Sequence, residues 1–336
     1  MKRRTMPPFI AWFAAVALLT IAPFGMSQAA LSQTPAASSA PADSAAALVS
    51  RARGLFELSK YKDAIALLDR ALALDPNQPR ALVLRGDAKS SLGDDAGALL
   101  DYNQAIHLAP EYAYAYATRC DTRRSLDDLA AALTDCNRAI ELDSELGVAY
   151  RFRGDVYYGL SDYPASIQNY THAIALTGDD VSAYTSRCRS YRALKAVTLA
   201  LADCNAAVKL DRDYGRGHFW LGVIAVDQAR WTDAVSSLNT TLHLDPETTG
   251  AFYYRALALH KLDKNELALQ DANAYIKLSP TDGDGLRLRG EIFSASHNST
   301  AAAADYKQAI ALYQQQGYAA AASEVRTLLT QLQAKP

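Results

Sequence analysis

Four cysteines are the residues of this 336-residue chain whose spacing most directly suggests chemistry. Cys120 and Cys136 have the same separation along the chain as Cys188 and Cys204. Neither pair has the short spacing of zinc ligands, and the long segment between the pairs argues against one metal site shared by all four thiols. Each pair is therefore expected to form a disulfide, which we favour, or to pack as two buried free thiols.

Arginine and aspartate recur with the separation that the paired cysteines have. Where Leu221 replaces the arginine, Ser237 replaces the acidic partner, and this joint loss argues for ion pairs and against a phosphate-binding ladder of arginines. Arg51 has Leu67 as its counterpart and is expected to be solvated. The expected pairs are Arg85–Asp101, Arg119–Asp135, Arg187–Asp203, Arg255–Asp271 and Arg289–Asp305, with Asn169 as the partner of Arg153.

No pattern of catalytic residues accompanies these pairs. The six histidines are scattered, and the chain has no Ser/His/Asp spacing, paired-carboxylate motif or phosphate-binding loop. We therefore predict a protein without enzymatic activity, cofactor or metal. The 34 basic and 36 acidic side chains give a formal net charge of −2, so charge provides no reason to expect nucleic-acid binding.

A regular sequence repeat positions these side chains. Numbered 1 to 34 from Ala45, each unit has small residues at positions 8 and 20 and an aliphatic residue at position 28. Small or apolar residues at 4, 8 and 11, and again at 20, 24, 27 and 28, follow the spacing of two amphipathic helices. Leucine occupies position 30 of every unit: Leu74, Leu108, Leu142, Leu176, Leu210, Leu244, Leu278 and Leu312.

Two antiparallel helices with a turn near position 15 bring position 7 opposite position 23, and position 8 opposite position 24. The arginines and aspartates occupy the first pair of positions, and the cysteines occupy the second. Both sets are therefore expected to join the two helices of a single repeat. One such hairpin cannot bury its apolar face alone, so eight of them are expected to stack. Three repeats carry glycine and tyrosine in place of the two cysteines: Gly86 with Tyr102, Gly154 with Tyr170, and Gly290 with Tyr306.

This repeat resembles the tetratricopeptide repeat, whose 34-residue unit has a small residue at position 8, alanine at 20 and 27, and proline at 32. The resemblance covers residues 45–316 and departs from the family where Thr241 and Tyr275 occupy position 27. It implies an all-α, right-handed α-solenoid of eight helix-turn-helix repeats. A C-terminal capping helix and tail are expected over residues 317–336, with an apolar stripe of Tyr318, Val325, Leu328, Leu329 and Leu332.

The N-terminal segment, residues 1–29, has the features of an export signal. Three basic residues precede an uncharged apolar run, and small residues at positions −3 and −1 permit cleavage after Ala29. The alternative is an uncleaved membrane anchor. Residues 30–44, rich in alanine, serine and proline, are expected to form a flexible linker. Export leads to an oxidising compartment, which is why we favour disulfides.

In members of this family, positions 2, 5, 9, 12 and 13 of the first helices line the concave side of the solenoid. The middle repeats place five arginines at such positions, which implies a groove suited to an acidic partner. Asp87, Asp121 and Asp155 share this face, so the alternative is a solvated surface whose charges neutralise one another. The predicted binding residues are Tyr114, Arg124, Arg151, Tyr158, Arg189, Arg192 and Arg216.

The sequence therefore predicts a non-enzymatic, exported, periplasmic scaffold that binds a protein or peptide in its concave groove. The carboxylate clamp of chaperone-binding members is not expected, because Val49, Arg53 and Leu84 occupy its first positions. The alternative function is an accessory subunit of an envelope enzyme or secretion complex. An uncleaved N-terminal segment would then anchor it in the inner membrane, facing the periplasm, and membrane contact is expected only in that case.

Overall fold

The computed structural model describes residues 44–334, which contain seventeen α-helices and no β-strand. The expected signal peptide and nearly all of the expected linker lie outside the described residues. No helix within 44–334 combines the length and the apolar character needed to cross a membrane. The helices are α1 (Ala45–Glu57), α2 (Tyr61–Leu74), α3 (Pro79–Ser91), α4 (Asp95–Leu108), α5 (Ala113–Ser125), α6 (Leu129–Leu142), α7 (Gly147–Gly159), α8 (Tyr163–Thr177), α9 (Val181–Ala193), α10 (Val197–Leu210), α11 (Gly215–Asp227), α12 (Trp231–Leu244), α13 (Thr249–Lys261), α14 (Asn265–Leu278), α15 (Gly283–Ala295), α16 (Ser299–Gln315) and α17 (Ala319–Gln333).

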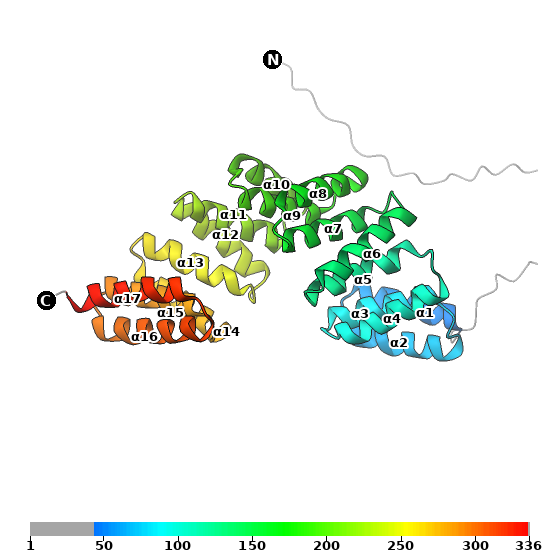
Figure 1. The fold of residues 1–336 in the computed structure, drawn as a ribbon, viewed down its shortest axis with the longest axis horizontal. Coiled ribbons are helices and arrows are strands. Elements are labelled where there is room, and N and C mark those ends of the chain that lie inside the picture. Colours follow the sequence, from blue (N-terminus) through cyan, green and yellow to red (C-terminus); the bar gives the residue numbers. More distant parts are fainter. Residues whose placement is uncertain (1–43, 335–336) are drawn as a thin grey trace, which may run out of the picture.

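The first sixteen helices form eight antiparallel hairpins that stack side by side into an arch (Figure 1). The first helices of successive hairpins, from α1 and α3 onward, contact one another. They therefore form the inner, concave layer of the arch, and the second helices form its outer layer. This arrangement confirms the predicted solenoid of eight helix-turn-helix repeats.

The turn within each hairpin depends on one residue at position 15. In every repeat this residue has a positive φ, between 54° and 81°, and in seven of the eight it is not glycine. An αL residue at this point lets the chain leave the first helix and reverse within a few residues. Asp94, Asp128, Asp162 and Asn298 follow directly and accept a hydrogen bond from the backbone N–H of the third residue of the next helix, which caps it.

The last helix, α17, packs on α16 and closes the C-terminal end of the solenoid (Figure 1). Ala322, Val325 and Leu332 are buried against the tyrosines of α16, with Leu328 and Leu329 partly buried beside them. This confirms the predicted C-terminal helix. The prediction is wrong for Tyr318, which precedes α17 and is 60% exposed. Ala322 is the first buried residue of the apolar face of α17.

Positions 8 and 24 set how closely the two helices of each repeat approach. A Cβ atom on Gly86 would lie 2.5 Å from a ring carbon of Tyr102, so only glycine leaves room for this buried ring. In repeats 3 and 5 the same positions are joined covalently. Cys120 bonds Cys136 with their Cα atoms 5.4 Å apart, and Cys188 bonds Cys204 at 5.6 Å, which confirms both predicted disulfides.

The predicted arginine–aspartate pairs are present in all five repeats that carry them. In each, Nε and one terminal nitrogen of the arginine donate to the two carboxylate oxygens at 2.6–2.9 Å. The aspartates are only 3–6% exposed. Arg153 donates from Nε to the side-chain oxygen of Asn169 at 2.7 Å. In the five arginine–aspartate pairs, the two hydrogen bonds replace the hydration that the buried carboxylate loses.

In the six position-7 arginines from Arg85 onward, another terminal nitrogen makes a contact that was not predicted from the sequence. It donates to a side chain at position 25 of the preceding repeat, at 2.6–2.9 Å. The guanidinium therefore links three helices from two adjacent repeats. Leu221 interrupts this series, so the junction between repeats 5 and 6 lacks the link. The position-25 acceptors are Asp69, Asn103, Asn137, Thr171, Asn239 and Asn273.

Removing one partner of such a pair should destabilise the protein more than removing both. We expect Arg255→Leu to lower the free energy of unfolding by about 3–5 kcal/mol, because Asp271 would remain buried and uncompensated. Adding Asp271→Leu should restore part of this loss. Urea denaturation followed by circular dichroism measures the free energy of unfolding of the two single variants and of the double variant. If the double variant loses the sum of the two single losses, the coupling is absent.

The disulfides should be present in freshly purified protein. Non-reducing peptide mapping is expected to link Cys120 to Cys136 and Cys188 to Cys204, and each bond closes a loop that stabilises the fold by ~3 kcal/mol. Reduction under mild denaturation should therefore lower the melting temperature. Four alkylatable thiols in the protein as isolated, or a link between the two pairs, would contradict this assignment.

Candidate functional site

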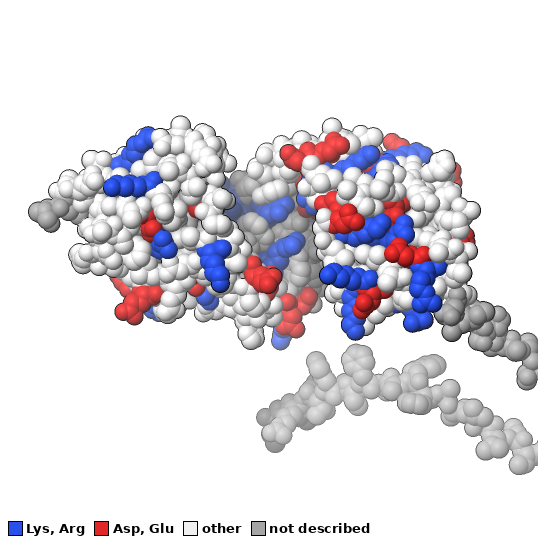
Figure 2. Space-filling view, turned by 90° about the horizontal axis from the view of Figure 1, so that it is seen from below, with Lys and Arg blue, Asp and Glu red and all other residues white. Residues whose placement is uncertain are grey.

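The concave side of the arch contains a hollow of about 730 Å³ over the middle repeats. Its lining comes from α5, α7, α9 and α11 and from the turn before α13. Seen from the open side of the arch, the hollow lies between its two ends and carries basic side chains on its walls (Figure 2). The hollow thus spans the first helices of four successive repeats, as a groove for an elongated partner requires.

Four of the predicted binding residues line this hollow together: Arg124, Arg151, Arg189 and Arg216. Tyr158 lies beneath one of them, because the Arg189 guanidinium stacks 3.7 Å from the centre of its ring. The structure does not bring the other two predicted residues, Tyr114 and Arg192, into the hollow. Tyr114 lies nearer the N-terminal end, and Arg192 faces a neighbouring pocket beside Asp227.

Two aromatic residues of the hollow were missing from the predicted set. Phe219 and Trp220 come from α11 and pack edge to face against each other. Phe219 occupies repeat position 5, which the family pattern already assigns to the concave side, so the register alone contained this signal. Trp220 occupies position 6, outside that pattern, and its position became evident only from the structure.

Three of the five groove arginines already have carboxylate partners. Arg124 donates to Asp121 from two nitrogens at 2.7 and 2.9 Å. Arg151 donates from Nε to Asp180 at 3.1 Å. Arg192 forms a bidentate pair with Asp227 at 2.6 and 3.0 Å. The charge of these three arginines is therefore locally neutralised, as in the alternative interpretation of this face.

Arg189 and Arg216 differ from the other three. Arg189 lies 4.0 Å from the nearest oxygen of Asp155, beyond hydrogen-bonding distance, and its buried Nε has no acceptor. Arg216 is exposed and makes no ion pair or hydrogen bond with the described residues. Their terminal N–H groups remain available to an anion in the hollow.

Two carboxylates at repeat position 9, Asp87 and Asp155, are held by tyrosines of the same hairpin. Asp87 accepts a hydrogen bond from Tyr102 at 2.8 Å, and Asp155 accepts one from Tyr170 at the same distance. Burial raises the pKa of Asp87 to about 6, although the hydrogen bonds that it accepts from Tyr102 and Tyr114 oppose the shift. Burial also raises the pKa of Asp155, against the hydrogen bond from Tyr170 and the charges of Arg151 and Arg124.

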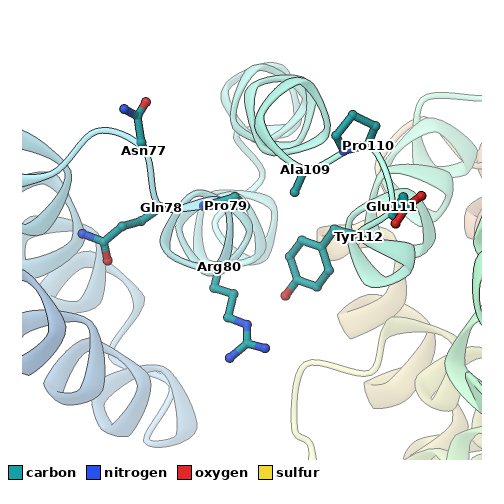
Figure 3. Close-up of a pocket in the computed structure, with 8 residues that line it drawn as sticks. All are labelled: Asn77, Gln78, Pro79, Arg80, Ala109, Pro110, Glu111 and Tyr112. Carbon is teal, nitrogen blue, oxygen red and sulfur yellow. The ribbon is translucent and has the colours of Figure 1, made fainter.

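A second concave region lies at the N-terminal end of the arch. Two successive inter-repeat turns, 77–80 and 109–112, enclose about 820 Å³ between them. Arg80 and Tyr112 extend from these turns to the same side (Figure 3). Both also line the adjoining pocket of about 390 Å³, together with Arg53, Phe56 and Tyr114. Neither Arg53 nor Arg80 makes an ion pair within residues 44–334.

These sites offer guanidinium donors, hydroxyl groups and aromatic faces, which are the groups that bind peptide segments. No group of three or more histidine, cysteine, aspartate or glutamate side chains suited to a metal ion occurs in the described part of the chain. Arginine, tyrosine and other aromatic side chains along a concave surface are suited to non-covalent recognition.

Comparison with solved structures supports the fold. A chain of the APC/C hetero-tetramer Cut9–Hcn1 superposes with a TM-score of 0.73 at 17% identity, covering 85% of this chain and 55% of that one. The present chain thus spans about half the length of that relative. A tetratricopeptide repeat protein from Parabacteroides merdae superposes with a TM-score of 0.54 at 17% identity, covering 76% of this chain and 98% of that one. No curated protein sequence matches significantly.

A family model described as tetratricopeptide repeat matches residues 49–115, 153–215 and 220–283. These segments make up more than half of the chain and fall within the eight stacked hairpins. Scaffolds of this kind are typical of protein–protein interaction. The match, the regular sequence period and the arch of paired helices lead to one conclusion: the chain belongs to the tetratricopeptide repeat family.

Proposed function

We propose that this protein is a non-enzymatic scaffold that is exported to the periplasm and binds a segment of another protein in its concave hollow. The observation that carries the proposal is the hollow itself, which crosses α5, α7, α9 and α11 without interruption. A long, shallow surface suits an extended or helical peptide better than a small molecule, which is usually enclosed by a pocket.

The composition of the hollow supports a partner that carries carboxylates. Arg189 and Arg216 offer unoccupied donors, and Phe219 and Trp220 offer an apolar surface next to them. Arginine and aromatic residues dominate the binding energy of many protein interfaces. Charged contacts of this kind would also make the affinity depend on salt, because ions screen exposed charges over about 8–10 Å.

Two features of the chain support export. The first is the pattern of residues 1–29, with a basic start, an apolar run and small residues before Ala30. The second is the pair of disulfides, since such bonds persist mainly in oxidising compartments such as the periplasm.

Blocking the hollow should abolish partner capture while the fold is kept. We expect Ser182→Trp to place an indole in the hollow, because Ser182 lines it at the start of α9. Immobilised wild-type protein and the variant would be incubated with envelope extract, and the retained proteins identified by mass spectrometry. Partners of the hollow should be retained by the wild type and lost from the variant.

A matched control separates blocking from a general effect of adding tryptophan. Ser236 is exposed on α12, a second helix of the outer layer, and Ser236→Trp should retain the same partners as the wild type. Thermal melts would verify that both variants are folded. Identical sets of proteins on all three chains would show that the hollow is not the docking surface.

The proposed export can be tested on the full-length chain expressed in a bacterium with a periplasm. We expect the protein in the periplasmic fraction, with an intact mass that begins at Ala30. Recovery of the uncut chain from the membrane fraction would instead support the anchored accessory subunit. Recovery of the uncut chain from the cytoplasm would contradict both.

A further inference from the structure

Two positions on neighbouring first helices lie side by side on the concave face. Position 9 of one repeat contacts position 2 of the next: the hydroxyl of Tyr114 donates to Asp87 at 3.4 Å, across a separation of 27 residues. Because the repeats have no insertions, residues at these two positions have the same separation along the chain at every junction. The lining of the pockets shows at which junctions such residues lie together in space.

Arginine occupies both positions at two junctions, and at no other. Arg53 on α1 is paired in this way with Arg80 on α3, and Arg189 on α9 is paired with Arg216 on α11. Each pair lines a single pocket, which supports their proximity. The remaining junctions hold Asp87 with Tyr114, Asp121 with Val148, Asp155 with Ser182, Val223 with Gly250, and Leu257 with Asp284.

Neither arginine pair has a hydrogen-bonded carboxylate partner within the described residues. Arg53, Arg80 and Arg216 are exposed and have no hydrogen-bonded or ion-paired partner among the described residues. Arg189 is oriented by stacking on Tyr158, with its nearest carboxylate oxygen 4.0 Å away. Glu57 and Asp87 also line the N-terminal pocket, and Asp121, Asp155 and Asp245 line the hollow. None of these carboxylates accepts a hydrogen bond from an arginine of the two pairs. Two like charges held side by side repel each other unless an anion lies between them.

Aromatic side chains accompany both pairs. Phe219 and Trp220 share the pocket of Arg189 and Arg216, and Phe56, Tyr112 and Tyr114 share the pocket of Arg53 and Arg80. Arg80 and Tyr112 extend to the same side of the structure (Figure 3). Each site therefore combines planar donors suited to a carboxylate with an apolar surface for the adjacent side chain.

We propose that the two arginine pairs, Arg53 with Arg80 and Arg189 with Arg216, are two separate carboxylate subsites for one partner polypeptide. The partner carries two acidic segments, each next to an aromatic or aliphatic residue, and crosses the intervening repeats between them. The inference rests on the proposed function and specifies its partner. It differs from the carboxylate clamp of the family, because that clamp uses lysine at position 5 and asparagine at positions 9 and 6.

If the two subsites bind one polypeptide, a peptide with two acidic segments should bind more tightly than a peptide with one. Once one segment is bound, the other binds at a high effective concentration, provided that the linker spans the distance. Fluorescein-labelled peptides with two Glu-Glu-Trp segments joined by Gly-Ser linkers of graded length would serve as the probe. Fluorescence anisotropy would compare them with peptides that have a single segment, and with peptides in which glutamine replaces glutamate.

The variants remove one or both pairs: Arg53→Gln with Arg80→Gln, Arg189→Gln with Arg216→Gln, and all four together. We expect the best two-segment peptide to bind the wild type about tenfold more tightly than the single-segment peptide. Either double variant should lose that advantage, and the quadruple variant should bind no better than the glutamine peptide binds the wild type. Arg138→Gln with Arg326→Gln is the matched control on the exposed surfaces of α6 and α17.

Equal binding of glutamate and glutamine peptides to the wild type would overturn the subsites, and so would unchanged binding to the quadruple variant. An advantage of two segments that survives in one double variant would overturn the role of that pair. A peptide whose only carboxylate is its C-terminus distinguishes terminal from side-chain recognition. Capture from envelope extract that depends on Ser182 but not on these arginines would refute the subsites and leave the proposed function standing.

Discussion

The guanidinium group at repeat position 7 is the constraint on which the geometry of the solenoid depends. Its Nε and one terminal nitrogen hold the aspartate of the same hairpin, and its other terminal nitrogen reaches the preceding repeat. A carboxylate that is almost fully buried would be costly without this fork, so the hairpin and the stacking of its neighbour are fixed together. The constant register of the concave face follows, because each junction with this link repeats the same offset.

The junction between repeats 5 and 6 shows what replaces the link when it is missing. Leu221 makes an apolar contact there, close to the disulfide of repeat 5. On the inner side of the same junction, Arg192 joins α9 to α11 through its bidentate pair with Asp227, so this arginine has a structural role. At this junction, which borders the hollow, the outer layer lacks the arginine link and the inner layer has a partly exposed ion pair.

Contacts within a hairpin could be predicted from the sequence, because antiparallel helices with a known turn place position 7 opposite position 23 and position 8 opposite position 24. The disulfides and the arginine–aspartate pairs followed from that one relation. Contacts between repeats could not be predicted in this way, because they depend on how far successive hairpins are offset. The pairing of Arg151 with Asp180 and the link from Arg85 to Asp69 both belong to this class. The partner of Arg192, Asp227 on the next repeat, belongs to the same class.

Position 9 of the first five repeats shows how the concave face distributes its charge. It reads Arg53, Asp87, Asp121, Asp155 and Arg189, so three carboxylates are flanked by two arginines. Tyrosine hydroxyls hold the first and third carboxylates, and an arginine on the same helix holds the second. The inner charges are thus occupied within the fold, whereas the outer two remain open and each has a second arginine beside it. A polypeptide bound as proposed would meet an arginine pair at each end of this stretch and, between the two pairs, three carboxylates that already have partners within the fold.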